Sequence, residues 1–120
     1  MLSLKTLLSL EWLAVLAAAV VAYAIAGFSW GLFALLILAP DLSMLGYLGG
    51  PRIGAIAYNA VHTLVAPAIL ALAAWLLGSP LAMALALILT AHIAADRALG
   101  YGLKYASGFK DSHLGKIGKG

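Results

Sequence analysis

Long runs of apolar residues make up most of the chain and are interrupted at only a few places. A helix needs roughly 17–25 such residues to cross the hydrocarbon core of a bilayer, and the runs have about this length. Short segments of glycine, proline and serine separate them, which is typical of turns. The pattern predicts four transmembrane helices, at about residues 7–26, 30–48, 53–77 and 81–99, followed by a basic tail at residues 100–120.

Two prolines lie inside these predicted helices. Pro40 falls within the second helix and Pro67 within the third. Proline has no backbone N–H, and its ring clashes with the preceding helical turn. We therefore expect a kink at Pro67, and we expect Pro40 to free backbone groups next to Asp41. Pro80 lies instead at the start of the fourth helix, where proline is well tolerated.

The composition agrees with a protein that faces lipid. Of the 120 residues, 65% are hydrophobic and only 9% are charged, whereas about a quarter are charged in soluble domains. We expect one all-α domain over residues 1–120, folded as an integral membrane four-helix bundle. The chain contains no cysteine, which excludes disulfides, iron–sulfur clusters and zinc sites built from thiolates.

The basic residues indicate how the chain is oriented. The connections between the first and second helices, and between the third and fourth, contain no lysine or arginine. By the positive-inside rule the other side is cytoplasmic, so both termini of this multi-pass chain are expected there. The net charge of +3 then indicates contact with anionic lipid headgroups rather than with nucleic acid. The small size is compatible with a homodimer. The cations on the predicted cytoplasmic side are Lys5, Arg52, Arg97, Lys104, Lys110, Lys116 and Lys119.

Polar residues within the predicted helices gather near the same side. Such residues are costly in lipid and commonly mark functional sites. At a rise of about 1.5 Å per residue, those of all four helices lie within about 15 Å of the cytoplasmic helix ends. They are Glu11, Asp41, Asn59, His62, His92 and Asp96.

The spacing of these polar residues favours a metal site. His92 and Asp96 are four residues apart and Asn59 and His62 are three apart, so each pair shares one helix face. If these faces point inward, two imidazoles and up to three carboxylates converge, a ligand set that suits zinc, manganese or iron. Helical bundles hold such metals with histidines and carboxylates from facing helices. We predict Asp41, His62, His92 and Asp96 as the metal ligands.

A metal site of this kind suits hydrolysis, because a bound metal lowers the pKa of its water. The chemistry predicts a metal-dependent hydrolase that acts on a lipid-like or phosphoester substrate at the cytoplasmic face. Glu11 and Asp41 are the expected catalytic carboxylates, with Glu11 as general base or further ligand. Cations beside the site suit an anionic headgroup. The residues expected to bind the substrate are Asn59, Arg97, Lys104 and His113.

Three other functions fit the same residues. A small transporter or proton relay could use Glu11, Asp41 and Asp96, since chains of carboxylates mark such pathways. A b-type haem could be held between His62 and His92. The polar groups of an accessory membrane protein could serve helix packing alone.

Short motifs surround the polar residues over nearly the whole chain. They are Leu10-Glu11, Pro40-Asp41-Leu42-Ser43-Met44, Gly46-Tyr47, Tyr58-Asn59, His62-Thr63, His92, Asp96-Arg97, the segment from Leu99 to Lys104, and Ser112-His113-Leu114-Gly115. With these motifs the chain resembles a bacterial family of small, uncharacterised four-helix membrane proteins. That resemblance implies the bacterial inner membrane and a fold, but no activity.

A second resemblance concerns the order of three motifs. Pro40-Asp41-Leu42, then His62-Thr63, then His92 with Asp96 is similar to membrane-bound metal-dependent hydrolases related to zinc phospholipases. This resemblance implies the same ligands, Asp41, His62, His92 and Asp96. The chain has Ser43-Met44 where that pattern has a further acidic residue and a histidine, and Glu11 where it has an N-terminal histidine.

Overall fold

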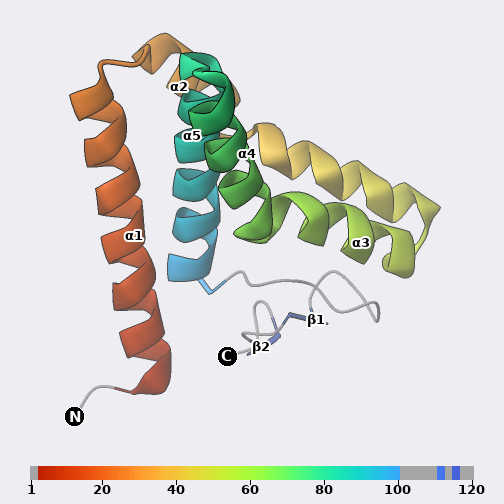
Figure 1. The fold of residues 1–120 in the computed structure, drawn as a ribbon. Coiled ribbons are helices and arrows are strands. Elements are labelled where there is room, and N and C mark those ends of the chain that lie inside the picture. Colours follow the sequence, from red (N-terminus) through yellow and green to blue (C-terminus); the bar gives the residue numbers. More distant parts are fainter. Residues whose placement is uncertain (1–2, 101–110, 113–114, 117–120) are drawn as a thin grey trace.

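The computed structural model describes residues 3–100, 111–112 and 115–116, which form helices and one short hairpin of strands (Figure 1). The predicted helical class is confirmed, although two of the predicted helices are each divided in two. The helices are α1 (Leu4–Ala26), α2 (Trp30–Leu36), the 3-10 helix η1 (Ala39–Gly49), α3 (Pro51–His62), α4 (Val65–Leu77) and α5 (Pro80–Ala98). The strands β1 (Asp111–Ser112) and β2 (Gly115–Lys116) pair in antiparallel fashion.

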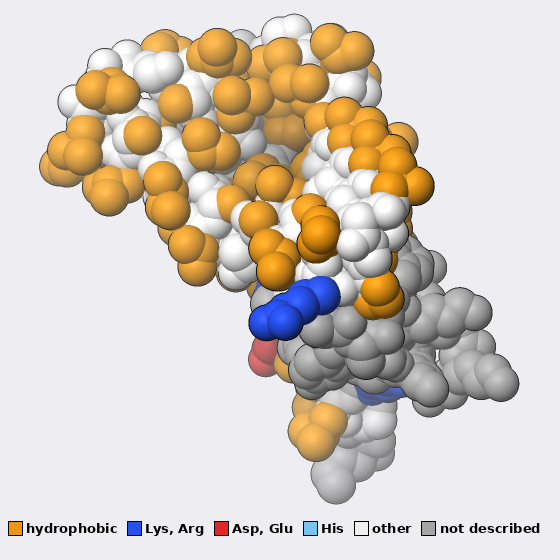
Figure 2. Space-filling view, turned by 90° about the vertical axis from the view of Figure 1, so that its right-hand side faces the viewer, with side chains coloured by type: hydrophobic (Ala, Val, Ile, Leu, Met, Phe, Trp, Pro, Cys, Tyr) orange, Lys and Arg blue, Asp and Glu red, His pale blue; other side chains and the backbone are white. Residues whose placement is uncertain are grey.

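Three helical segments are long and apolar enough to cross a membrane. They are α1, the stretch Trp30–Gly49 that contains α2 and η1, and α5. A fourth span results if α3 and α4, which are bent by 41°, are taken together. Large apolar side chains lie on the outside, among them Ile25 and Leu77. In Figure 2 hydrophobic side chains are spread over the described part of the visible face, and charged ones appear only toward one end of it. This surface suits lipid.

Helix α5 lies at the centre of the fold, with α1 on one side and α4 on the other (Figure 1). Both neighbours run antiparallel to it, so the start of α1 and the end of α5 lie at the same end of the molecule. Many of the buried α5 residues are alanines, which let neighbouring backbones approach closely. The buried residues of α5 are Ala84, Ala86, Ile88, Ala91, His92, Ile93 and Ala94. Helices η1 and α3 form an arm that projects sideways from this group.

The helix ends follow familiar capping rules. The side-chain oxygens of Ser3, Ser29 and Ser79 accept N–H hydrogen bonds at the starts of α1, α2 and α5, which satisfies donors that the helix itself leaves unpaired. Helices α1 and α4 end at Gly27 and Gly78, whose φ angles are 73° and 61°. Glycine takes up this left-handed conformation without steric cost.

Pro40 explains why the predicted second helix is divided. Its ring would clash with the carbonyl of Leu36, four residues earlier, and α2 ends at Leu36. Beyond the break, the backbone N–H of Asp41 donates to Leu38 at 3.0 Å, in the tighter 3-10 pattern. In an α-helix this N–H would donate to Ile37 instead. The Ile37 carbonyl is therefore available to a donor from another helix.

Pro67 acts in the same way on the predicted third helix, but the bend lies one turn before the proline. The residue four positions earlier is Thr63, which is extended (φ −90°, ψ 147°) and ends α3 just after His62. The N–H of Ala66 donates to the Thr63 carbonyl at 3.2 Å, whereas a continuous helix would direct it to His62. The His62 carbonyl is thereby released as well.

Two glycines bring η1 and α3 into close contact along the arm. A Cβ atom on Gly46 would lie 2.7 Å from the Cβ atom of Ala57, and one on Gly54 would collide with the ring of Tyr47. Both approaches require the absence of a side chain. This tight packing holds η1 against α3 in the outer part of the arm, near the turn at Gly50.

Candidate metal centre

Two histidines from different helices face each other at the base of the arm. His62 is the last residue of α3, and His92 lies on α5. Each is only 3% exposed. The Nδ1 atom of His62 lies 2.8 Å from the Tyr58 carbonyl, and that of His92 lies 2.6 Å from the Ile37 carbonyl. Because a carbonyl can only accept, each Nδ1 carries the proton, and in the neutral ring Nε2 presents a lone pair.

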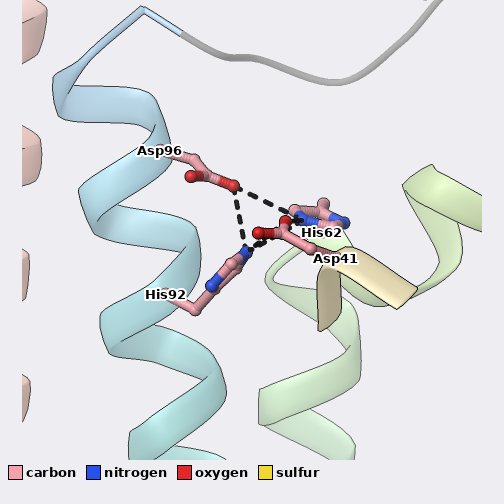
Figure 3. Close-up of side chains that lie close together, drawn as sticks. All are labelled: Asp41, His62, His92 and Asp96. Atoms are coloured by element: carbon pink, nitrogen blue, oxygen red, sulfur yellow. Dashed lines mark hydrogen bonds and ion pairs between the residues drawn. The ribbon is translucent and has the colours of Figure 1, made fainter. Parts of the chain in front are cut away.

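Two carboxylates complete the group (Figure 3). Asp41 comes from the start of η1, and Asp96 lies one helical turn after His92 on α5. An oxygen of Asp41 lies 3.1 Å from His92 Nε2 and 3.5 Å from His62 Nε2. An oxygen of Asp96 lies 3.1 Å and 3.4 Å from the same two nitrogens. The two Nε2 atoms are themselves 3.1 Å apart. All four ligand atoms lie within 4.8 Å of one another.

The group is short of positive charge. With neutral imidazoles, four hydrogen-bond acceptors point at one another and no proton lies between them, while the two carboxylates carry two negative charges. The imidazoles are buried and the carboxylates are partly so, and holding such a set together without a cation is costly. One divalent metal ion would balance both charges and give every acceptor a partner. Two imidazolium ions would also balance the charge, but they would place like charges on nitrogens 3.1 Å apart.

The separations between the ligand atoms fit a small tetrahedral ion. Zinc bonds to nitrogen and oxygen of about 2.0–2.2 Å put neighbouring tetrahedral ligands about 3.3–3.6 Å apart. The five separations given above run from 3.1 to 3.5 Å, and the sixth, between the two carboxylates, lies within 4.8 Å. The residues therefore form a group that can hold a metal ion.

The proline breaks supply the hydrogen bonds that orient the site. The Ile37 carbonyl released near Pro40 accepts from His92 Nδ1. The His62 carbonyl released by Pro67 accepts from the Arg97 guanidinium, whose nitrogen lies 3.3 Å away. Metal-binding histidines usually donate their second N–H to such an acceptor, which fixes the ring and its tautomer. Each break thus releases a carbonyl that accepts a hydrogen bond from a side chain of α5, close to one of the four residues of the group.

Replacing Pro40 by alanine tests this link between the helix break and the site. The variant allows α2 to continue, so the N–H of residue 41 can take the Ile37 carbonyl away from His92. We expect metal affinity to fall by about 10–100-fold, as it does when orienting partners are removed. Equilibrium dialysis against zinc measures this.

Pro80→Ala is the matched control for this prediction. Pro80 lies in the first turn of α5, where its missing N–H has no helical acceptor. Its replacement should leave metal affinity unchanged. Equal affinities of the Pro40→Ala variant and the parent would mean that the Ile37 carbonyl does not orient His92.

Further contacts hold His62 and Arg97 in place. The ring of Tyr58 stacks on that of His62 with centroids 3.7 Å apart and planes 4° apart. Arg97 lies over the ring of Trp12 on α1, 4.6 Å from its centroid, a favourable cation–π contact. Arg97 thereby connects α1, α5 and the end of α3 beside the metal ligands.

The predicted ligands Asp41, His62, His92 and Asp96 come together, but the other predicted site residues have different positions. Glu11 is exposed on α1 and does not belong to the group. Arg97 contacts the chain itself, as described above, and Asn59 is half-buried on α3. Lys104 and His113 lie outside the described residues. The roles of Ile37 and Trp12 were not predicted. For Ile37 a signal existed, because its carbonyl lies within one turn of Pro40.

Comparison with known proteins identifies a family. Neither the curated proteins nor the solved structures contain a match to the chain. A family model described as a domain of unknown function, DUF4260, matches residues 5–117. The predicted resemblance to uncharacterised proteins is confirmed in this form, whereas the likeness to metal-dependent hydrolases remains a prediction. Because the match covers most of the residues of the chain, the chain belongs to the DUF4260 family.

Proposed function

We propose that the chain is a membrane-embedded metal-dependent hydrolase that acts on a lipid-like or phosphoester substrate. The observation that carries this proposal is the convergence of four acceptor atoms, two of them from buried imidazoles oriented by backbone carbonyls. Zinc is the preferred ion, with manganese and iron as alternatives. When bound, the ion would supply a polarised water at neutral pH.

The exposure of the four ligands supports access from one side. The side chain of Asp41 is 42% exposed and that of Asp96 is 20% exposed, whereas both histidines are buried. Four protein ligands fill a tetrahedral site, so hydrolysis requires a fifth ligand or the release of one carboxylate. Asp41 is the most exposed of the four ligands, and we expect it to be the one that releases the metal ion.

Asp41 is then well placed to act as general base. It accepts a proton from water while the water oxygen bonds to the phosphorus or carbonyl carbon of the ester. The ester bond breaks, and the leaving oxygen takes up a proton to depart as an alcohol. The second product is an acid. Asp96 and the two histidines keep their positions, and Arg97 holds the His62 carbonyl throughout.

We place the site at the cytoplasmic face of a bacterial inner membrane. In this proposal α1, α2 with η1, α3 with α4, and α5 form four membrane passes, which puts both termini in the cytoplasm. Support comes from the basic residues, which the positive-inside rule puts on that side, and from Asp96, which lies in the last turn of α5. Anionic headgroups and the cations around the site would then lie at the same level.

A proton relay is the second candidate, because Asp41, His62, His92 and Asp96 form a continuous chain of close contacts from an exposed to a buried group. It predicts proton flux in liposomes without a bound metal. A haem held between the histidines is disfavoured. Two axial histidines lie on opposite sides of one iron with the porphyrin between them, whereas these two nitrogens are 3.1 Å apart and both contact the same two carboxylates.

Removal and return of the metal test the proposed function. Protein purified without a polyhistidine tag is placed in phospholipid vesicles, and release of acid from the lipid is measured. We expect chelator-stripped protein to be inactive and one equivalent of zinc, manganese or iron to restore turnover. Vesicles without protein, given the same metal, are the control. Equal turnover with and without metal, or proton flux through metal-free protein, would contradict the hydrolase and favour the proton relay.

A further inference from the structure

An apolar cleft lies beside the metal centre and is separate from it. Its volume is about 310 Å³, at the lower end of the roughly 300–1,000 Å³ typical of small-molecule sites. Helices α2, η1, α3, α4 and α5 all contribute to its walls, and every lining side chain is apolar. The lining includes Leu36, Pro40, Val61, Leu70, Leu85 and Ile88.

The walls of the cleft continue directly into the ligands of the site. Pro40 precedes Asp41, and Val61 precedes His62. Ile88 lies four residues before His92 on α5 and so shares its helix face. A molecule in the cleft would therefore lie beside the residues that carry the ligand atoms. The cleft offers that molecule no polar side chain along its length.

We propose that this cleft holds one acyl chain of the substrate, so that the chain's ester end lies at Asp41. The inference rests on the proposed function and narrows its substrate class to acyl-chain lipids, rather than soluble phosphoesters. The walls belong to segments that are long and apolar enough to span a membrane. In a membrane, lipid acyl chains would surround these segments. The volume suits one chain rather than a whole two-chain lipid.

The cleft would act by orientation and not by affinity. Lipid tails around the protein are as apolar as its leucines, so a tail gains little by moving from bilayer to cleft. What the cleft supplies is a fixed position for the ester, and positioning of reacting groups can account for a large part of a rate enhancement. Blocking the cleft should therefore lower turnover of lipid without altering the amount of protein in the membrane.

Leu70→Trp and Leu72→Trp form a matched pair for the test. Both residues lie on α4, but Leu70 lines the cleft while Leu72 is 56% exposed on the outer surface. Neither is a metal ligand. Each variant is placed in phosphatidylglycerol vesicles that contain a phosphatidylglycerol with a diazirine at the end of one acyl chain. After illumination, lipid adducts are mapped by mass spectrometry, and metal content and turnover are measured on the same samples.

We expect adducts of the parent to concentrate on the cleft walls of α4 and α5. In Leu70→Trp these adducts, and the turnover of long-chain lipid, should fall at least tenfold, while metal content stays at the parent level. Leu72→Trp should match the parent throughout. Adducts spread evenly over the outer surface, or a Leu70→Trp variant that behaves like Leu72→Trp, would overturn the acyl-chain site while leaving the hydrolase in place. Concentrated adducts on a protein without metal would support the cleft and remove the hydrolase.

Discussion

Replacement of His62 or His92 by alanine should abolish metal binding. Each histidine supplies one of four ligand atoms, and its Nε2 lies 3.1–3.5 Å from the other three. Loss of an orienting partner alone costs about 10–100-fold in affinity, so loss of a ligand should cost at least about 100-fold. Elemental mass spectrometry on untagged protein should show close to one metal ion per chain in the parent and background levels in both variants.

Two matched variants control for this result. His113→Ala removes the remaining histidine of the chain, and Glu11→Gln removes an acidic residue of α1 that lies outside the group. Both should keep the metal. Zinc should also raise the melting temperature of the parent but not of the histidine variants, because a ligand at about 100 times its Kd stabilises the folded state by about 2.7 kcal/mol. Metal retained by both alanine variants would show that it binds elsewhere.

The convergence of these four residues was predictable because polar residues are conspicuous in membrane-spanning segments. Asp41, His62, His92 and Asp96 stand in otherwise apolar runs, and lipid leaves such groups few partners other than each other. The position of each residue along its helix then placed all four at a similar depth in the membrane. The four-residue spacing of His92 and Asp96 further indicated that they share one helix face. Depth and helix face follow from the sequence whatever the helix packing, so the four residues converge although the packing differs from a regular four-helix bundle.

The arm formed by η1 and α3 could not be predicted in the same way. Hydropathy along residues 30–48 and 53–77 is that of two continuous spans, and a proline indicates that a helix is disturbed but not by how much. The direction of the chain after the break depends on tertiary contacts, here the hydrogen bond from His92 to Ile37 and the packing of Gly54 against Tyr47. Glu11 was placed in the site by depth alone, and its exposed side chain shows that depth does not fix direction.

Replacing Asp41 and replacing Asp96 should have different effects on metal content and on turnover. Asp41 and Asp96 lie at similar distances from the two imidazoles, so distance alone does not separate their roles. Their exposure does separate the two roles, because the side chain of Asp41 is 42% exposed and that of Asp96 only 20%. Asp96 also follows His92 by one turn on the same rigid helix, whereas Asp41 follows a helix break. A less exposed carboxylate on a rigid helix is suited to hold a metal, and a more exposed one at a break is suited to move.

Asp41→Asn should therefore lower turnover far more than it lowers metal content. The amide keeps an oxygen that can serve as a ligand, but it cannot accept a proton, and loss of a general base typically costs about 10²–10⁴-fold in rate. Asp96→Ala is the comparison, because it leaves no oxygen to serve as a ligand, and it should lose metal, with turnover falling in proportion to occupancy. Turnover per bound metal ion, measured in vesicles after zinc loading, separates the two cases. If Asp41→Asn turns over as fast as the parent at equal occupancy, the base lies elsewhere, and Glu11→Gln becomes the next variant to measure, because Glu11 is the other carboxylate predicted to act as base.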